Sequence, residues 1–237
     1  MRNEELKDLF DQQAAGYDKQ WAGMAPIRDA LYLLLDSLFA GLPENARILC
    51  VGVGTGAELA HLAERFPGWH FTAVDPSAAM LDICRQRATE GGFLSRCSFH
   101  QGYLDTLPAE PSHHGATCFL VSQFLLEAQA RIAFFHEIAC RLGPGAILAN
   151  ADLASDVESP AYEALLRSWM TLMSSVRPTW TAASRDAARS TCGGTSNTAS
   201  VPPERAIRRT IWPPWTPMRA VAPPGANGMT MRIGRVG

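Results

Sequence analysis

The sequence predicts a doubly wound α/β fold with a mostly parallel sheet, preceded by a helical segment. From Arg47 onward, short apolar runs alternate with helical stretches, and a glycine-rich turn follows the first of these runs. Continuous apolar runs are typical of parallel strands that helices cover on both faces. With 237 residues, of which 47% are hydrophobic, the chain can bury one substantial core.

Helical periodicity marks the first 40 or so residues. One segment carries Leu6, Leu9 and Phe10, and a second carries Ile27, Leu31, Leu34, Leu35 and Leu38. Gly41-Leu42-Pro43 ends the second helix. We therefore expect residues 1–45 to form a helical lead, or lid, ahead of the sheet.

The alternation that follows predicts a core domain over residues 46–176. Strands are expected at 47–52, 70–75, 96–101, 116–122 and 146–151, and helices at 56–66, 77–89, 128–142 and 159–175. Gly143-Pro144-Gly145 is the expected break between the third of these helices and the last strand. The last helix would carry one apolar stripe, made of Tyr162, Leu165, Leu166, Trp169, Leu172 and Met173.

The pattern changes abruptly after Val176. Residues 177–237 contain nine arginines, no lysine and three Pro-Pro pairs, and we expect them to form an irregular tail, with the C-terminal strands of the sheet missing or replaced. Two interpretations compete: a disordered basic extension, or residues read from a shifted frame of a GC-rich gene. We favour the second because Trp180, Trp212 and Trp215 are unusual in a disordered segment. Resequencing the gene tests it, since a clean open frame with no strand pattern in either alternative frame would contradict a frameshift.

Charge and composition exclude several classes of function. Residues 1–176 hold 12 Lys and Arg against 21 Asp and Glu, so the predicted core is acidic and a nucleic-acid partner is not expected. No apolar run approaches the roughly 20 residues that a membrane span needs, and no signal peptide is visible, which favours a cytoplasmic protein. The six cysteines form no Cys-x-x-Cys pair, so structural zinc is not expected.

The most informative motif is an apolar strand that runs into Gly52-Val53-Gly54-Thr55-Gly56 and then a helix. Glycines permit a tight turn and close approach of a ligand, and the helix N-terminus offers free N–H groups. Asp75 ends the second strand, where a carboxylate can accept hydrogen bonds from both hydroxyls of a ribose. A helix-capping role for Asp75 is the alternative, although Ser77 could supply that cap. The pattern predicts a site for a nucleotide-like ligand.

These residues resemble the class I S-adenosylmethionine-dependent methyltransferases, over roughly residues 10–175. The resemblance rests on the glycine turn, on the sequences Val74-Asp75-Pro76-Ser77 and Met80-Leu81, on Gln101-Gly102-Tyr103 after the third strand, and on Leu142-Gly143-Pro144-Gly145. Phe10-Asp11 with Tyr17-Asp18 also resembles the lid that small-molecule members place ahead of the first strand. The family implies a Rossmann-like fold, S-adenosylmethionine as cofactor and methyl transfer to a small-molecule acceptor.

The resemblance implies a set of cofactor-binding residues: Tyr17, Gly52, Val53, Gly54, Thr55, Gly56, Asp75, Pro76, Met80, Gly102, Tyr103 and Ser122. Tyr103 departs from the acidic residue that most members carry at this position. It could stack on the adenine but cannot accept from the adenine amine as a carboxylate would, and whether Asp105 substitutes stays open.

Two other functions remain as alternatives. A nicotinamide-dependent dehydrogenase fits because Gly52-x-Gly54-x-x-Ala57 also satisfies the relaxed dinucleotide motif, but the long helical lead and the third glycine at Gly56 favour the methyltransferase. A catalytically inactive cofactor-binding protein fits a chain whose last strands are missing, since the fifth strand would then have an uncovered edge.

The sequence assigns no catalytic residue, because the sulfonium already activates the methyl group and the protein mainly aligns the reactants. Tyr17, Trp21 or Phe124 could face the sulfonium. Ser122 and Gln123 follow the fourth strand without the Asp/Asn-Pro-Pro-aromatic signature of enzymes that methylate nucleic-acid bases. His100 is the histidine nearest the expected site, and Arg28 either pairs with a carboxylate of the ligands or is an ordinary surface residue.

Overall fold

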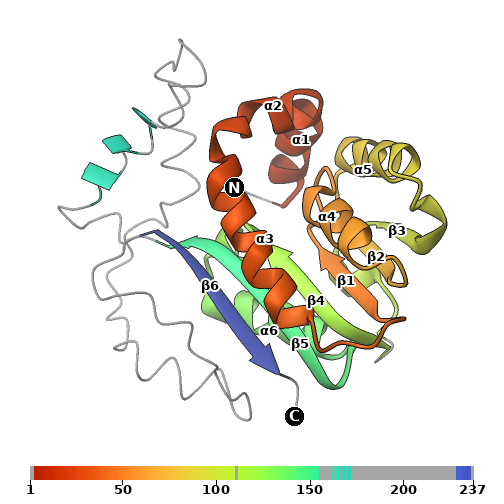
Figure 1. Ribbon diagram of the computed structural model, residues 1–237. Coiled ribbons are helices and arrows are strands. Elements are labelled where there is room, and N and C mark those ends of the chain that lie inside the picture. Colours follow the sequence, from red (N-terminus) through yellow and green to blue (C-terminus); the bar gives the residue numbers. More distant parts are fainter. Residues whose placement is uncertain are drawn as a thin grey trace.

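The computed structural model describes residues 3–109, 112–154 and 228–235, together with residues 162, 164–165, 167–168 and 170–171. One six-stranded sheet, in the order β3-β2-β1-β4-β5-β6, forms its centre (Figure 1). The strands are β1 (Arg47–Val51), β2 (His70–Asp75), β3 (Cys97–Gln101), β4 (His113–Phe119), β5 (Leu142–Ala154) and β6 (Gly228–Arg235).

Strands β1 to β5 are parallel, and only β6 pairs antiparallel, with β5. The order of the strands reverses at β1, which lies between β2 and β4, so the connections leave β1 and β4 on opposite faces of the sheet. A crevice outside the carboxyl ends of these two strands is the usual ligand site of such sheets. The doubly wound, mostly parallel Rossmann-like sheet with helices ahead of it is confirmed.

Helices cover both faces of the sheet. They are α3 (Ala25–Phe39), α4 (Ala57–Arg65) and α5 (Ala78–Glu90) on one face and α6 (Ala128–Ala139) on the other. Successive residues of β1 serve the two faces in turn, because side chains alternate along a strand: Ile48 and Cys50 pack with α3 and α4, while Leu49 and Val51 pack toward α6. This two-sided burial explains the continuous apolar run in the sequence.

The N-terminal segment consists of α1 (Asn3–Gln13), η1 (Ala14–Gly16), α2 (Tyr17–Gln20), η2 (Ala22–Met24) and α3. Helices α1 and α2 lie above the carboxyl ends of the parallel strands (Figure 1). Helix α3 buries Leu31, Tyr32, Leu35 and Phe39. Two of the residues expected on its buried stripe, Ile27 and Leu34, are 37% and 48% exposed, because the helix turns its Tyr32 side inward instead.

In three elements a boundary lies at least three residues from the sequence prediction. Strand β4 begins at His113 rather than 116, because His113 is buried and its ring bonds the Arg141 carbonyl oxygen (2.9 Å) and Thr72 Oγ1 (3.0 Å). Helix α6 ends at Ala139 rather than 142. Strand β5 extends over Leu142–Ala154, and Gly143-Pro144-Gly145 lies within it as a bulge against β4 instead of breaking it.

The irregular tail predicted for 177–237 is wrong over residues 228–235, which form β6. Its backbone pairs with β5 from Ile147↔Arg235 to Ala154↔Gly228. Residues 229–233, Met-Thr-Met-Arg-Ile, alternate apolar and polar side chains, which is the period of a half-covered strand, but the surrounding arginines and prolines obscured it. Residues 177–227, on which the rest of this prediction rests, lie outside the described residues.

The helix predicted at 159–175 is described in part. Residues 162, 164–165, 167–168 and 170–171 are helical, and the other positions of its apolar stripe lie outside the described residues. Within the part of the chain that the structure describes, none of the helices combines the length and the apolar composition of a membrane span. The five described cysteines are free thiols.

The remaining short elements are η3 (Leu94–Arg96), η4 (Leu104–Thr106) and η5 (Ser122–Phe124). Two of them stand at the carboxyl edge of the sheet: η4 follows β3, and η5 follows β4. With the turn after β1 and the N-terminus of α5 after β2, they place four chain segments around the crevice.

Candidate functional site

The glycine turn between β1 and α4 is built by its backbone. Gly52, Gly54 and Gly56 have φ of +64°, +54° and +77°, a left-handed conformation that residues with a Cβ adopt only at a cost. A Cβ on Gly52 would lie 2.3 Å from Val121 Cγ2, and one on Gly56 would lie 2.4 Å from Cys84 Sγ. At Gly54 no atom stands within 4 Å of that position. Two glycines therefore permit close packing, and the middle one faces open space.

Asp75 joins this turn to the end of β2. Its carboxylate accepts hydrogen bonds from the backbone N–H of Gly54 (2.8 Å, to Oδ2) and of Ser77 (2.9 Å, to Oδ1). The side chain is 8% exposed, and burial raises the pKa of the carboxyl, although these two N–H groups act in the opposite direction. Each oxygen keeps a lone pair for a further donor.

Ser77 takes the helix-capping role that was the alternative interpretation of Asp75. Ser77 is the N-cap of α5, and its Oγ accepts from the backbone N–H of Met80 (3.2 Å). Met80 itself is 2% exposed, and Pro76 is half-buried between the strand and the helix. The carboxylate at the end of β2 is thus not needed to cap α5.

The segment after β3 approaches the same edge. The Gly102 N–H donates to the Asp75 carbonyl oxygen (3.1 Å). The Tyr103 hydroxyl is buried without a hydrogen-bond partner, and burial raises its pKa, with smaller effects from Glu4 and Lys7 of α1. Asp105, the suggested substitute for the missing acid, is exposed in η4.

A polar cluster that the sequence did not reveal fastens the turn after β4 to the end of β5. Asp152 accepts from Ser122 Oγ, from Asn150 Nδ2 (2.9 Å) and from the Gln123 N–H (3.3 Å). Gln123 Oε1 in turn accepts from the Leu153 N–H (2.9 Å). Ser122 and Gln123, expected as walls of the site, therefore hold η5 in place. An acid directly after the apolar run of β5 was the available signal.

Leu120 stands just before this cluster with φ of +60°, the left-handed conformation in a residue that carries a Cβ. Its N–H donates to the Ala151 carbonyl oxygen (2.7 Å). Such strain persists where the surrounding structure fixes it, and it is often found beside ligand sites. Here it turns the chain from β4 toward the crevice.

The N-terminal segment closes over the crevice through two aspartates. Asp11 Oδ1 accepts from Ser77 Oγ (2.6 Å) and from the Ala79 N–H (3.2 Å), at the start of α5. Asp18 accepts from Thr55 Oγ1 (2.7 Å), in the glycine turn, and pairs with Arg87 of α5. The lid is therefore attached both to the turn and to the helix that follows Asp75.

Aromatic side chains line the underside of this lid. Phe10 contacts Tyr17 edge to face at 6.3 Å and Phe124 of η5 at 5.7 Å, and Tyr17 lies 6.1 Å from Trp21. Burial, followed by repulsion from Asp18, Asp75 and Glu58, raises the pKa of Tyr17 to about 12. The three aromatic residues considered for the sulfonium, Tyr17, Trp21 and Phe124, thus belong to one cluster around Phe10 and Tyr17.

Two other candidates lie apart from the crevice. His100 is on the edge strand β3, and its Nε2 bonds Thr106 Oγ1 (2.7 Å). Arg28 is on the surface of α3, where it pairs with Asp29 (3.0 Å) and lies over the Tyr32 ring. Arg28 is therefore seen in the ordinary surface arrangement, and neither residue contacts the glycine turn or Asp75.

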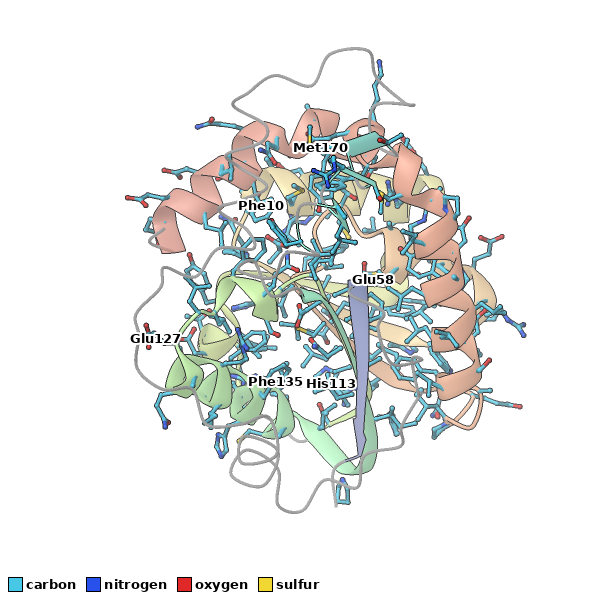
Figure 2. All side chains as sticks on the ribbon, turned by 90° about the vertical axis from the view of Figure 1, so that its left-hand side faces the viewer. Phe10, Glu58, His113, Glu127, Phe135 and Met170 are labelled. Carbon is cyan, nitrogen blue, oxygen red and sulfur yellow. The ribbon has the colours of Figure 1, made fainter. Side chains whose placement is uncertain are left out.

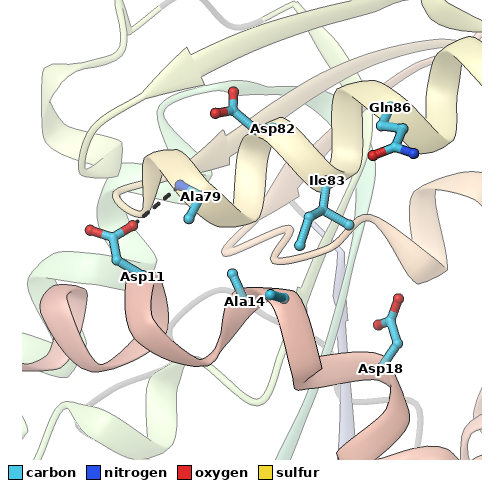
Figure 3. Close-up of a pocket in the computed structure, with 8 residues that line it drawn as sticks. Asp11, Ala14, Asp18, Ala79, Asp82, Ile83 and Gln86 are labelled. Atoms are coloured by element: carbon cyan, nitrogen blue, oxygen red, sulfur yellow. Dashed lines mark hydrogen bonds between the residues drawn. The ribbon is translucent and has the colours of Figure 1, made fainter.

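An open groove of about 560 Å³ lies on the outer side of the lid, between the N-terminal segment and α5 (Figure 3). Its lining residues are Asp11, Ala14, Ala15, Asp18, Ala79, Asp82, Ile83 and Gln86. Neither the glycines of the turn nor Asp75 lines this groove, so it is distinct from the crevice. Among the described residues, no group of three or more His, Cys, Asp or Glu side chains is placed to hold a metal ion.

The reversal of strand order at β1, the glycine turn and the carboxylate at the end of β2 define a nucleotide-type cofactor domain. Comparison with known proteins gives a match for the central part of the chain. Residues 48–145 match the sequence profile described as a methyltransferase domain. This match supports the class I S-adenosylmethionine-dependent methyltransferase that the motifs predicted.

Two curated relatives match short parts of the chain. The malonyl-(acyl-carrier protein) O-methyltransferase of Geobacter sulfurreducens is 40% identical over 75 residues, which are 32% of this chain and 27% of that protein. The tRNA1(Val) adenine(37)-N6 methyltransferase of Vibrio campbellii is 33% identical over 72 residues, 30% of this chain and 29% of that protein. The matches thus span less than a third of the length of either relative.

Solved structures share the fold over most of the chain. A candidate S-adenosylmethionine-dependent methyltransferase from Methanococcus maripaludis superposes with a TM-score of 0.61 at 18% identity, covering 95% of this chain and 93% of that one. The (4+2)-cyclase SpnF superposes with a TM-score of 0.56 at 16% identity, covering 88% and 82%. Because one of these proteins is described as a cyclase, the fold alone does not assign the reaction.

Proposed function

We propose that this chain transfers a methyl group from S-adenosylmethionine to a small-molecule acceptor by in-line displacement. The pairing of Gly54 with Asp75 supports the proposal most directly. The Gly54 N–H fixes the carboxylate at 2.8 Å, directly below a turn where the space beside Gly54 is open. A diol such as a ribose needs this combination of an acceptor and room for close approach.

The residues present fit the cofactor. Asp75 keeps lone pairs for the ribose hydroxyls, and the backbone of Gly52–Gly56 would lie against the ribose and the methionine portion. Gly102 and Tyr103 would flank the adenine, with Pro76 and Met80 below it. Thr55 and Val53 would complete the walls, and Tyr17 the roof, while Ser122 holds η5 in place through Asp152.

When bound, S-adenosylmethionine supplies a methyl group that its sulfonium has already activated. The chain itself holds the reactants. The aromatic cluster of the lid offers ring faces to a cation, worth about 0.5–2 kcal/mol. The two aspartate contacts of the lid, Asp11 with α5 and Asp18 with Thr55, keep water out while the acceptor is aligned.

Three observations favour a small molecule as the acceptor. Residues 1–176 carry 21 acidic against 12 basic residues, an excess that repels nucleic acid. The segment Ser122-Gln123-Phe124 lacks the signature of base-methylating enzymes. The lid lies across the crevice through Phe10 and Phe124, which limits access for a polymer. The tRNA methyltransferase among the relatives makes a tRNA control necessary.

The first experiment is calorimetric titration of the full chain with S-adenosylmethionine and, separately, with NADH. We expect S-adenosylmethionine to bind and Asp75→Ala to weaken that binding. Asp82→Ala is the matched control, because Asp82 is exposed on α5 and pairs only with Arg85 among the described residues. Binding of NADH instead would identify a dehydrogenase.

A second experiment tests the acceptor. Transfer of labelled methyl from S-adenosylmethionine is measured with pools of small metabolites and with bulk tRNA. We expect label in the small-molecule fraction. Label in the tRNA alone would contradict the acceptor class, and cofactor binding without transfer to either would favour a binding protein that does not methylate.

A further inference from the structure

Glu58 is a buried carboxyl group beside the glycine turn. It stands in the first turn of α4, two residues after Gly56, and is 8% exposed. In Figure 2 it lies between the N-terminal helices and the sheet. Across the described part of the chain, no ion pair reaches it, and its own backbone N–H is its hydrogen-bond donor.

The groups that face Glu58 contribute little positive charge. Asp75, from β2, repels Glu58 more strongly than Arg87, from α5, attracts it. The Arg87 guanidinium also pairs with Asp18. Its other titratable neighbours are neutral at pH 7: Tyr17, Tyr32, Cys50, Cys84 and Cys118. Among these neighbours, Asp75 is a second buried acid, and the one cation, Arg87, already pairs with Asp18.

This environment leaves the charge of Glu58 undecided near neutral pH. Burial raises its pKa to about 7, and repulsion from Asp75 adds to this effect. A buried carboxylate without a cation lowers the stability of a folded chain. Ionised Glu58 therefore does not stabilise this chain when no ligand is bound. An exposed acid would serve the helix N-terminus equally well. A ligand that brings a cation would remove this cost.

We propose that Glu58 is the anionic partner of the sulfonium of the cofactor, and that it ionises when this cation binds and so favours the donor over the product, whose thioether sulfur is uncharged. This inference rests on the proposed function. The proton of the Glu58 carboxyl leaves to solvent on binding, and the carboxylate remains beside the cation. After methyl transfer the sulfonium charge has gone, although the α-ammonium of the product remains. The carboxyl then takes up a proton again, and the product is held less tightly.

The test measures protons rather than turnover. The full chain is titrated at pH 7 with S-adenosylmethionine, S-adenosylhomocysteine and adenosine, each in phosphate and in Tris, whose ionisation heats differ. We expect release of about half a proton with the donor, because a carboxyl with a pKa near the pH is half protonated, and less with the other two ligands. Glu58→Gln should abolish the release.

The variant should also change selectivity. A fall of about one pKa unit in Glu58 on binding corresponds at pH 7 to about a fivefold preference for the donor, because half of the free sites are already ionised. Glu58→Gln should remove this preference while leaving adenosine binding unchanged. Glu58→Asp should keep part of the release. Glu64→Gln is the matched control, because Glu64 is exposed on the same helix.

Three outcomes separate the explanations. Donor binding without buffer-dependent proton release overturns the inference and leaves the proposed function standing. Equal losses of affinity for donor, product and adenosine in Glu58→Gln overturn it too, because they indicate a structural role. If the folded wild-type chain binds neither donor nor product, the proposed function and the inference fail together.

Discussion

The floor and the roof of the crevice are made in different ways. The floor, from Gly52 to Gly56 and Asp75, is fixed by backbone conformation and backbone hydrogen bonds, with three left-handed glycines and an N–H to carboxylate bond of 2.8 Å. The roof is attached by a few side chains, among them Asp11 and Asp18, whose contacts lie near the surface. A floor built from backbone tolerates almost no substitution, whereas a roof held by side chains can loosen without loss of the fold.

The largest effect is expected at Gly56. Alanine there would place a Cβ 2.4 Å from Cys84 Sγ in a left-handed conformation. Strain and overpacking together should lower the free energy of unfolding by about 3 kcal/mol. Urea denaturation measures it, with Gly41→Ala as control because Gly41 has open space and no left-handed φ. A loss no greater than in the control would show that the floor is not rigid.

Glu58→Gln should stabilise the folded chain at alkaline pH. The pKa of Glu58 is raised from 4.5 to about 7 in the folded chain. The protonated carboxyl therefore makes its full contribution to the free energy of unfolding below pH 4.5, and this contribution is lost as the pH rises through 7. The variant should therefore gain about 2–3 kcal/mol over the wild type at pH 8 and little at pH 4. Urea denaturation at both values checks this, and the same gain in Glu64→Gln would contradict it.

Gly54→Ala separates folding from binding. No atom would clash with the new Cβ, so only the left-handed φ of +54° should cost stability, about 1 kcal/mol. The methyl group would occupy the open space of the turn, and cofactor affinity should fall by more than tenfold. Calorimetry and denaturation on one preparation test both, and a variant that binds normally would show that the cofactor does not approach Gly54.

The smallest effect on stability is expected in the roof. Asp18→Asn weakens the contacts with Thr55 and Arg87, which are partly exposed, and should cost no more than about 1 kcal/mol. The cofactor should nevertheless dissociate several times faster, because the lid opens more readily. Stopped-flow tryptophan fluorescence of the chain reports the rate, and Asp29→Asn on the exposed face of α3 is the control. An unchanged rate would mean that Asp18 does not hold the lid.

Features fixed by the local backbone and features fixed by contacts between distant residues also differ in how well the sequence predicts them. Gly52, Gly54, Gly56 and Asp75 were identifiable because each meets a local requirement of the chain, and β2 was predicted with its observed bounds. Asp152 and Glu58 were missed because their importance comes from contacts made across the sheet or from burial. The start of strand β4 was predicted three residues late because His113 is buried against Thr72 and Arg141, which its place in the sequence does not show.

The predicted site residues also differ in how well the sequence placed them. The structure brings Tyr17, Thr55, Asp75 and Ser122 to one edge of the sheet, as the resemblance implied, and their contact with a cofactor stays a prediction. His100 and Arg28 were candidates by position in sequence, but β3 is an edge strand and Arg28 lies on the outer side of α3. Sequence spacing places a residue on an element, whereas packing decides which way it faces.

Strand β6 has a consequence for how the chain reaches this structure. Residues 228–235 pair with β5, which ends at Ala154, so the partner of β5 is synthesised much later than β5 itself. Until then its edge offers unpaired N–H and C=O groups to any neighbouring chain. Refolding yield should therefore fall as protein concentration rises, and a peptide of residues 228–235 added in excess should restore it. Strand β6 is translated well after β5, so the sheet gains its sixth strand late in folding.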